Sequence, residues 1–200
     1  MNRRGLSIGL GLLAIVLVAV GAVMQNQSNF SHHYVTTQLA EHGIVFTPAA
    51  NLLPAQQKIP CLVANADKPL KTGKQAECYG RYQIGIDLTL IDNGKTYFQD
   101  HYNGFLTRQK MYAAVKSDPN STATQELVKQ SAAADTTAND LLAGEATKGL
   151  LLAAYGFSVL GDRAGQAAMV CFVVAGLLLV AAVGLFVVSS GKRGASLHGS

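Results

Sequence analysis

The chain has 200 residues, of which 49% are hydrophobic and 14% are charged, and it contains no Trp. Soluble domains carry about 25% charged residues, so this composition indicates a membrane protein with a modest polar part. The length leaves room for one ordinary domain besides any membrane segments. The formal net charge of +4 lies in two short tails, which argues against nucleic-acid binding and for membrane retention.

Two apolar runs account for this composition. Residues 6–24 form a run of 19 residues and residues 167–189 a run of 23, and neither contains a charged side chain. A helix rises about 1.5 Å per residue and the hydrocarbon core is about 30 Å thick, so both runs can span a bilayer. Backbone groups in hydrocarbon need partners within the segment, which predicts two transmembrane helices.

The first run has two interpretations. The basic start "MNRR" suits both an uncleaved signal anchor and a cleavable signal peptide. The run is longer than a typical signal-peptide core of about 7–15 residues, which favours the anchor. Val20 and Ala22 provide a weak cleavage site, so a cleavable signal peptide is the alternative.

Charge placement predicts the orientation. Four basic residues flank the runs on their outer sides, namely Arg3, Arg4, Lys192 and Arg193. The remaining Lys and Arg and all Asp and Glu lie between the runs and balance one another. Because positive flanks stay in the cytoplasm, we expect an integral plasma-membrane protein with cytoplasmic tails at 1–5 and 190–200. Residues 25–166 would then be extracytoplasmic.

The external region is expected to be mainly α-helical. A helix from Ser31 should end at Gly43. The three closely spaced prolines Pro48, Pro54 and Pro60 then predict an extended connector. Thr72 and Gln75 form a capping-box pattern that opens a helix ending near Asn93.

A second external helix over 95–115 should pack on the first through its aromatic side chains, namely Tyr97, Phe98, Tyr102, Phe105 and Tyr112. After a turn at 117–122, helical signal returns from 123 to 160. The predicted fold is therefore mainly α, with two transmembrane helices flanking an extracytoplasmic helical domain. The last external helix should continue into the second span.

The apolar segment 150–160 is too short to cross a membrane. Its face can pack on the external helices, which we favour, or lie at the headgroup boundary. The residues of this predicted core or partner face are Leu150, Leu151, Leu152, Tyr155 and Phe157.

Cys61 and Cys78 are the two cysteines of the external region. An oxidising compartment would allow them to form a disulfide, which we predict, although spacing alone does not prove proximity. Such a bond would close a short loop and stabilise a small domain by about 3 kcal/mol. Cys171 lies within the second run and is expected to pack as a small apolar residue.

Small residues mark candidate contacts between the spans. Gly5 and Gly9 form a GxxxG pattern, and Gly176 and Gly184 lie on one face of the second run. Glycines permit close helix approach, either between the two spans of one chain or in a homodimer.

No catalytic, cofactor or metal site is predicted. His32, His33, His42 and His101 have acidic residues in the chain around them, but no spacing matches a zinc pattern. The sequence also lacks a phosphate-binding glycine loop and a local nucleophile signature.

The segments "GIVFTP", "KTGKQAECYGRYQIGIDL", "NGKTYFQ" and "GEATKGLLLAAYGFSVLG" occur in this order along the chain. In this respect the chain resembles a family of small two-pass membrane proteins of actinobacteria, including mycobacteria. The resemblance implies two spans around an external helical region and no established activity. Some members bear the label aromatic ring-opening dioxygenase, a chemistry that requires two histidines and a carboxylate around iron, and this sequence shows no such set.

These observations favour a noncatalytic envelope protein that presents an external helical domain to a partner. The partner would be the lipid bilayer, another membrane or envelope protein, or a second copy, and not a nucleic acid. Two alternatives stay open: a sensor or binder of a small envelope ligand, and a metal-dependent enzyme.

Overall fold

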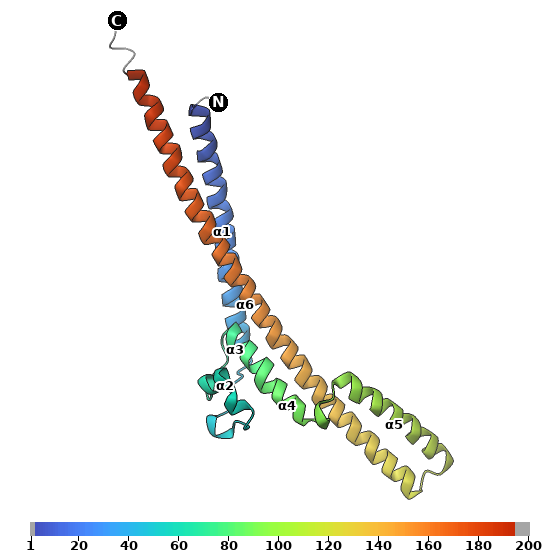
Figure 1. Ribbon diagram of the computed structural model, residues 1–200. Helices are drawn as coiled ribbons and strands as arrows, with labels where there is room; N and C mark the ends of the chain where they lie inside the picture. The colour runs from blue at the N-terminus through green and yellow to red at the C-terminus, as the bar shows by residue number, and fades with distance from the viewer. Residues whose placement is uncertain (1–2, 195–200) are drawn as a thin grey trace. The chain divides into compact units, whose positions relative to one another are not determined.

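The computed structural model describes the backbone of residues 3–194 and the side chains of residues 5–188. Within that part of the chain the fold is all-α, with one isolated bridge between Val45 and Pro69 and no strand. The α-helices are α1 (Arg3–Glu41), α2 (Pro60–Asn65), α3 (Gly73–Cys78), α4 (Gly85–Leu90), α5 (Tyr97–Ser117) and α6 (Thr122–Gly194) (Figure 1). Shorter elements are the 3-10 turns η1 (Ala49–Asn51), η2 (Gln56–Lys58) and η4 (Asp92–Gly94), and the π-helix η3 (Tyr79–Ile84).

The chain divides into two compact units. Unit 1 comprises Met1–Tyr34 and Phe157–Ser200, and unit 2 comprises Val35–Gly156. Unit 1 therefore contains most of α1 and the second half of α6, whereas unit 2 contains all the shorter helices.

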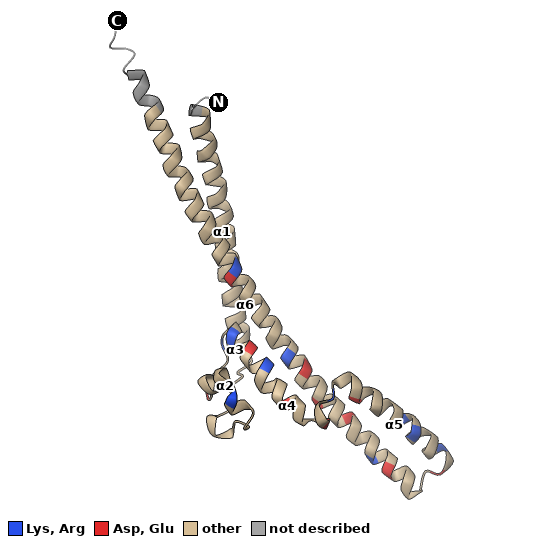
Figure 2. Cartoon of the chain, in the orientation of Figure 1, with Lys and Arg blue, Asp and Glu red and all other residues tan. Residues whose placement is uncertain are grey.

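The apolar stretches of α1 and α6 are long and apolar enough to cross a membrane, by length and composition. Figure 2 shows α1 without a Lys, Arg, Asp or Glu from Gly5 to Ala40, and α6 likewise from Ala164 to Val188. Both helices extend beyond the predicted spans, because α1 continues to Glu41 and α6 begins at Thr122.

In unit 1 the two helices pack through small side chains that recur every seven residues. The buried positions are Ser7, Ala14, Gly21 and Ser28 in α1, and Gly161, Ala168, Ala175 and Ala182 in α6. A seven-residue repeat keeps one stripe of each helix on its partner, and small residues allow the backbones to approach closely.

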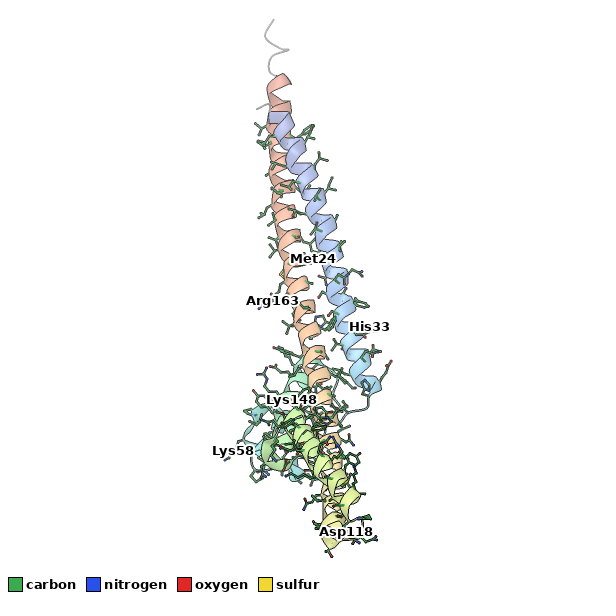
Figure 3. All side chains as sticks on the ribbon, turned by 90° about the vertical axis from the view of Figure 1, so that its right-hand side faces the viewer. Met24, His33, Lys58, Asp118, Lys148 and Arg163 are labelled. Carbon is green, nitrogen blue, oxygen red and sulfur yellow. A yellow bond between two sulfur atoms is a disulfide. The ribbon has the colours of Figure 1, made fainter. Side chains whose placement is uncertain are left out.

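Contacts along this seam show that the two helices run antiparallel. The Ser7 hydroxyl donates to the Ala182 carbonyl at 2.9 Å, and the Ser31 hydroxyl donates to the Phe157 carbonyl at 2.6 Å. A Cβ built on Gly165 would lie 3.6 Å from the Ser28 Cβ. Along the pair, Arg163 lies between the levels of Met24 and His33 (Figure 3).

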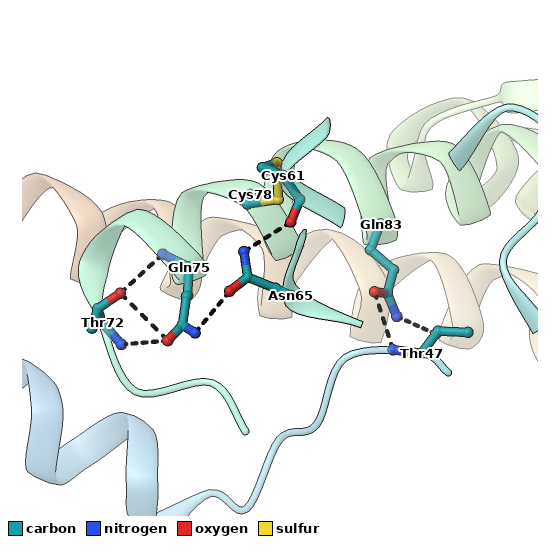
Figure 4. Close-up of a disulfide and its surroundings, with 7 residues drawn as sticks. All are labelled: Thr47, Cys61, Asn65, Thr72, Gln75, Cys78 and Gln83. Atoms are coloured by element: carbon teal, nitrogen blue, oxygen red, sulfur yellow. Dashed lines mark hydrogen bonds between the residues drawn. A yellow bond between two sulfur atoms is a disulfide. The ribbon is translucent and has the colours of Figure 1, made fainter. Parts of the chain in front are cut away.

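The core of unit 2 is small and is built from several elements. Its buried members are Val35, Leu39, Phe46, Leu62, Leu70, Ala76, Cys78 and Leu151. The predicted disulfide is confirmed, since Cys61 and Cys78 are bonded and pin α2 to α3 (Figure 4). Burial of a large apolar side chain such as Leu or Phe contributes about 1.5–3 kcal/mol to stability. A disulfide contributes about 3 kcal/mol, so it adds substantially to a core built from so few residues.

Helix limits in unit 2 follow local sequence signals. The capping box predicted at Thr72 and Gln75 is confirmed, and Thr96 with Gln99 forms a second one at the start of α5. Gly43, just after α1, has φ +60°, a conformation that glycine adopts without strain. The predicted extended connector is interrupted by the 3-10 turns η1 and η2. Helix α2 begins at its last proline, Pro60, where the first helical N–H needs no partner.

Candidate interaction surface

The predicted face at 150–160 divides between a core and an open surface. Leu151 is 3% exposed and joins the core of unit 2, so the core interpretation is confirmed for this residue. Leu150 and Phe157 are exposed, whereas Leu152 and Tyr155 are half-buried. In unit 1, Phe157 lines a groove of about 270 Å³ with Gln27, Phe30, Ser31, Leu160, Gly161 and Ala164.

A polar network joins the connector to the central helices of unit 2. The Gln83 side chain is 4% exposed and bonds both the backbone N–H and the hydroxyl of Thr47 (Figure 4). The buried Gln56 amide donates to the Asp87 carboxylate at 2.8 Å. Burial raises the pKa of Asp87, and the hydrogen bond from Gln56 lowers it in part. These buried amides are satisfied, so the network fixes the path of the connector.

Helices α5 and the start of α6 lie side by side in unit 2, and Asp118 lies at the end of this hairpin (Figures 1 and 3). Their contact uses small residues, because a Cβ on Gly104 would lie 3.5 Å from the Ala134 Cβ. Arg108 forms an ion pair with Asp135, and the Tyr97 backbone N–H donates to Glu145 at 2.9 Å. The helices therefore pair without burying a large apolar side chain of α5.

Four of the five Tyr and Phe side chains of α5 point away from this contact, and the fifth, Tyr97, is half-buried. The exposed fractions are 77% for Phe98, 61% for Tyr102, 46% for Phe105 and 61% for Tyr112. We call these four residues the ring face. The expectation that they would pack on the preceding helix was wrong, because α5 pairs with α6 through the opposite side, where Gly104 lies.

An electrostatic cluster lies where α5 begins. Asp100 is 6% exposed, and its Oδ2 has no hydrogen-bond partner among the described residues. Burial raises the pKa of Asp100, and a hydrogen bond with Asp92 raises it further. Hydrogen bonds from Lys95 and then Asp100 lower the pKa of Asp92. The two carboxyl groups can therefore share one proton beside the Lys95 ammonium.

No group of three or more His, Cys, Asp or Glu side chains in the described part of the chain could hold a metal ion. The histidines considered in the sequence have separate contacts. His32 lies 3.2 Å from Asp162 in unit 1, and His101 contacts the Tyr97 hydroxyl in unit 2.

The four glycines proposed for packing between spans do not lie on the seam of unit 1. A Cβ on Gly5, Gly9, Gly176 or Gly184 would meet no atom within 4 Å. The seam repeats every seven residues and includes Ser and Ala, whereas Gly5 and Gly9 are four residues apart and lie off it. A role of these glycines between two copies stays a prediction. The side chains of Arg3, Arg4, Lys192 and Arg193 lie outside the described residues.

Comparison of the chain with protein-family models, with curated proteins and with solved structures gives no match. The resemblance to two-pass actinobacterial proteins therefore stays an expectation. Among the exposed surfaces of unit 2, the ring face gathers four exposed aromatic side chains on one helix.

Proposed function

We infer that this chain is a noncatalytic, membrane-anchored protein of the cell envelope that presents unit 2 to a protein partner. The observation that carries this inference is the ring face, an aromatic helix surface that no described residue covers. Contiguous apolar surface of this kind marks interaction sites, and Tyr and Phe are enriched at the centres of protein interfaces.

The two long apolar helices support anchoring in a membrane. The basic tails support cytoplasmic termini and an extracytoplasmic unit 2. The Cys61–Cys78 disulfide agrees with this placement, because such bonds persist in oxidising compartments.

Orientation is tested with single cysteines and a membrane-impermeant thiol reagent in a Cys171→Ser background. Asn120→Cys lies in the exposed turn between α5 and α6 and should label in intact cells. Ser196→Cys lies in the C-terminal tail and should label only after lysis. The reverse pattern would contradict the proposed orientation.

The partner is tested by purifying the protein from native membranes in mild detergent. A protein that co-elutes in constant ratio should be lost with the variant Phe98→Ala, Phe105→Ala and Tyr112→Ala. The control variant Val63→Ala with Leu90→Ala also removes exposed apolar side chains of unit 2, and it should retain the partner. Recovery of the wild-type chain alone would count against a presenting role.

A further inference from the structure

We propose that the ring face of α5 binds an amphipathic helix of a partner protein that carries acidic side chains beside its apolar stripe. This inference rests on the proposed function, and it names the surface of unit 2 that is used and the chemistry of the partner. Its evidence is the spacing of the rings, the contact on the far side of α5, and the charge of the exposed residues.

The rings have the spacing of a helix–helix seam. Phe98, Tyr102 and Phe105 are four and three residues apart, and Tyr112 follows seven residues later. Gln109 lies on the same face, four residues after Phe105 and three before Tyr112. The face therefore repeats every three or four residues over about 21 Å of helix. Repeats of this period are typical of surfaces that pack along a second helix.

The opposite side of α5 packs on α6. Gly104 and Asp100 are its buried residues, and Gly104 lies against Ala134 of α6. Rotation of α5 to bury the rings would remove this close contact and the Arg108–Asp135 ion pair. The rings are therefore held outward by the hairpin itself.

Charge selects an acidic partner. Asp100 is the single acidic residue of α5, and it is buried, whereas Lys110 and Lys116 are exposed. In a parallel pair of α5 helices the two Lys116 side chains would meet at the same end of the stripe, and like charges at an interface are unfavourable. An acidic helix complements them instead.

Residues on the ring face itself favour a helix over a lipid surface. Gln109 lies among the rings, and Lys116 continues the same stripe one turn after Tyr112. Contact with acyl chains would leave these polar groups without partners, whereas a helix can supply carboxylate and amide partners for them.

The test uses the full chain in neutral-lipid nanodiscs. Because the chain contains no Trp, Tyr102→Trp gives a single fluorescent reporter on the ring face. Two Trp-free helical peptides of about four heptads serve as probes, both with Leu at the seam positions, one with Glu and the other with Lys at the flanking positions. The Glu peptide should shift the emission to the blue and bind at least tenfold more tightly than the Lys peptide.

Three variants in the same assay make the result specific. Removing the other rings with Phe98→Ala, Phe105→Ala and Tyr112→Ala should weaken binding of the Glu peptide at least tenfold. Lys110→Glu with Lys116→Glu should reverse the preference toward the Lys peptide. A reporter at Val128→Trp, on the exposed side of α6, should not respond.

Other occupants of the ring face give different results. A blue shift on adding excess wild-type chain, which is Trp-free, would identify a second copy and overturn the proposal. A shift on moving to anionic nanodiscs without peptide would identify lipid and also overturn it. Equal binding of the two peptides, or binding of neither, would overturn the acidic-helix partner. The proposed function would still stand if native co-purification depends on the rings.

Discussion

Gly80 lies directly against Leu151, since a Cβ on Gly80 would stand 3.1 Å from the Leu151 Cβ and 3.4 Å from the Lys148 carbonyl oxygen. This contact brings the π-helix η3 against α6 within unit 2. Leu151 is 3% exposed, so little space exists there for a larger side chain.

We expect Gly80→Leu to lower the free energy of unfolding of unit 2 by about 1–3 kcal/mol, because the added side chain must displace packed neighbours. The matched control is Gly149→Leu, at a helical glycine of α6 where a Cβ meets no atom within 4 Å. Urea-dependent proteolysis of the full chain measures both variants. A similar loss in the two would show that the Gly80 contact is not the cause.

The disulfide gives a second prediction. Replacement of both bonded cysteines, Cys61→Ser with Cys78→Ser, should destabilise unit 2 by about 3 kcal/mol, because the bond closes a loop with a sequence separation of 17. Cys171 is not bonded, so Cys171→Ser should leave the urea midpoint unchanged. An unchanged midpoint after reduction of the wild-type protein would contradict this prediction.

The burial of Asp100 should make the stability of unit 2 depend on pH. Its folded-state pKa is raised, first by burial and then by Asp92, so its stabilising contribution is present below its unfolded pKa near 3.8. That contribution is lost as the pH rises through the folded pKa. Asp100→Asn, which can donate to Asp92 without a charge, should therefore raise the stability of unit 2 at pH 7.

This gain over the wild type should shrink as the pH falls through the raised folded-state pKa of Asp100 and its carboxyl becomes protonated. Urea midpoints measured across this range provide the test. The control Asp140→Asn removes an exposed carboxylate of α6 and should show no such convergence. A constant difference between Asp100→Asn and the wild type at all pH values would refute the shared-proton arrangement.

Pairing of α1 and α6 within one chain is tested by crosslinking. Ser28→Cys with Gly165→Cys, in a Cys171→Ser background, places two Cβ atoms about 3.6 Å apart, within the range of disulfides. Mild oxidation should give an intramolecular crosslink that changes gel mobility without doubling the mass. Ser28→Cys with Gly176→Cys should not react, and a covalent dimer from the first pair would show pairing between copies.

Local signals in the sequence predicted many features of unit 2. Thr72 with Gln75 and the glycine after α1 act within a few residues, so their effects do not depend on the rest of the fold. The membrane-length helices and the Cys61–Cys78 bond were also predictable, from apolar length and from cysteine count.

The candidate surface could not be predicted in the same way. The spacing of Phe98, Tyr102 and Phe105 defines a face, but it does not say which neighbour covers that face. Gly104 on the other side of α5 indicated a close helix contact, and this signal was missed. The seam of unit 1 was missed for a related reason, because Ser, Ala and Gly share a seven-residue repeat that glycine spacing alone does not reveal.

Helix α5 has few buried residues, which affects how easily it unfolds locally. Its buried residues are Asp100 and Gly104, whereas α3 contributes Ala76 and Cys78 to the core and is tied down by the disulfide. Segments with few buried apolar contacts open at low free-energy cost, so amide protons of α5 should exchange with solvent before those of α3. The ring face thus lies on a helix that opens more easily than α3, and a bound partner would slow amide exchange there first.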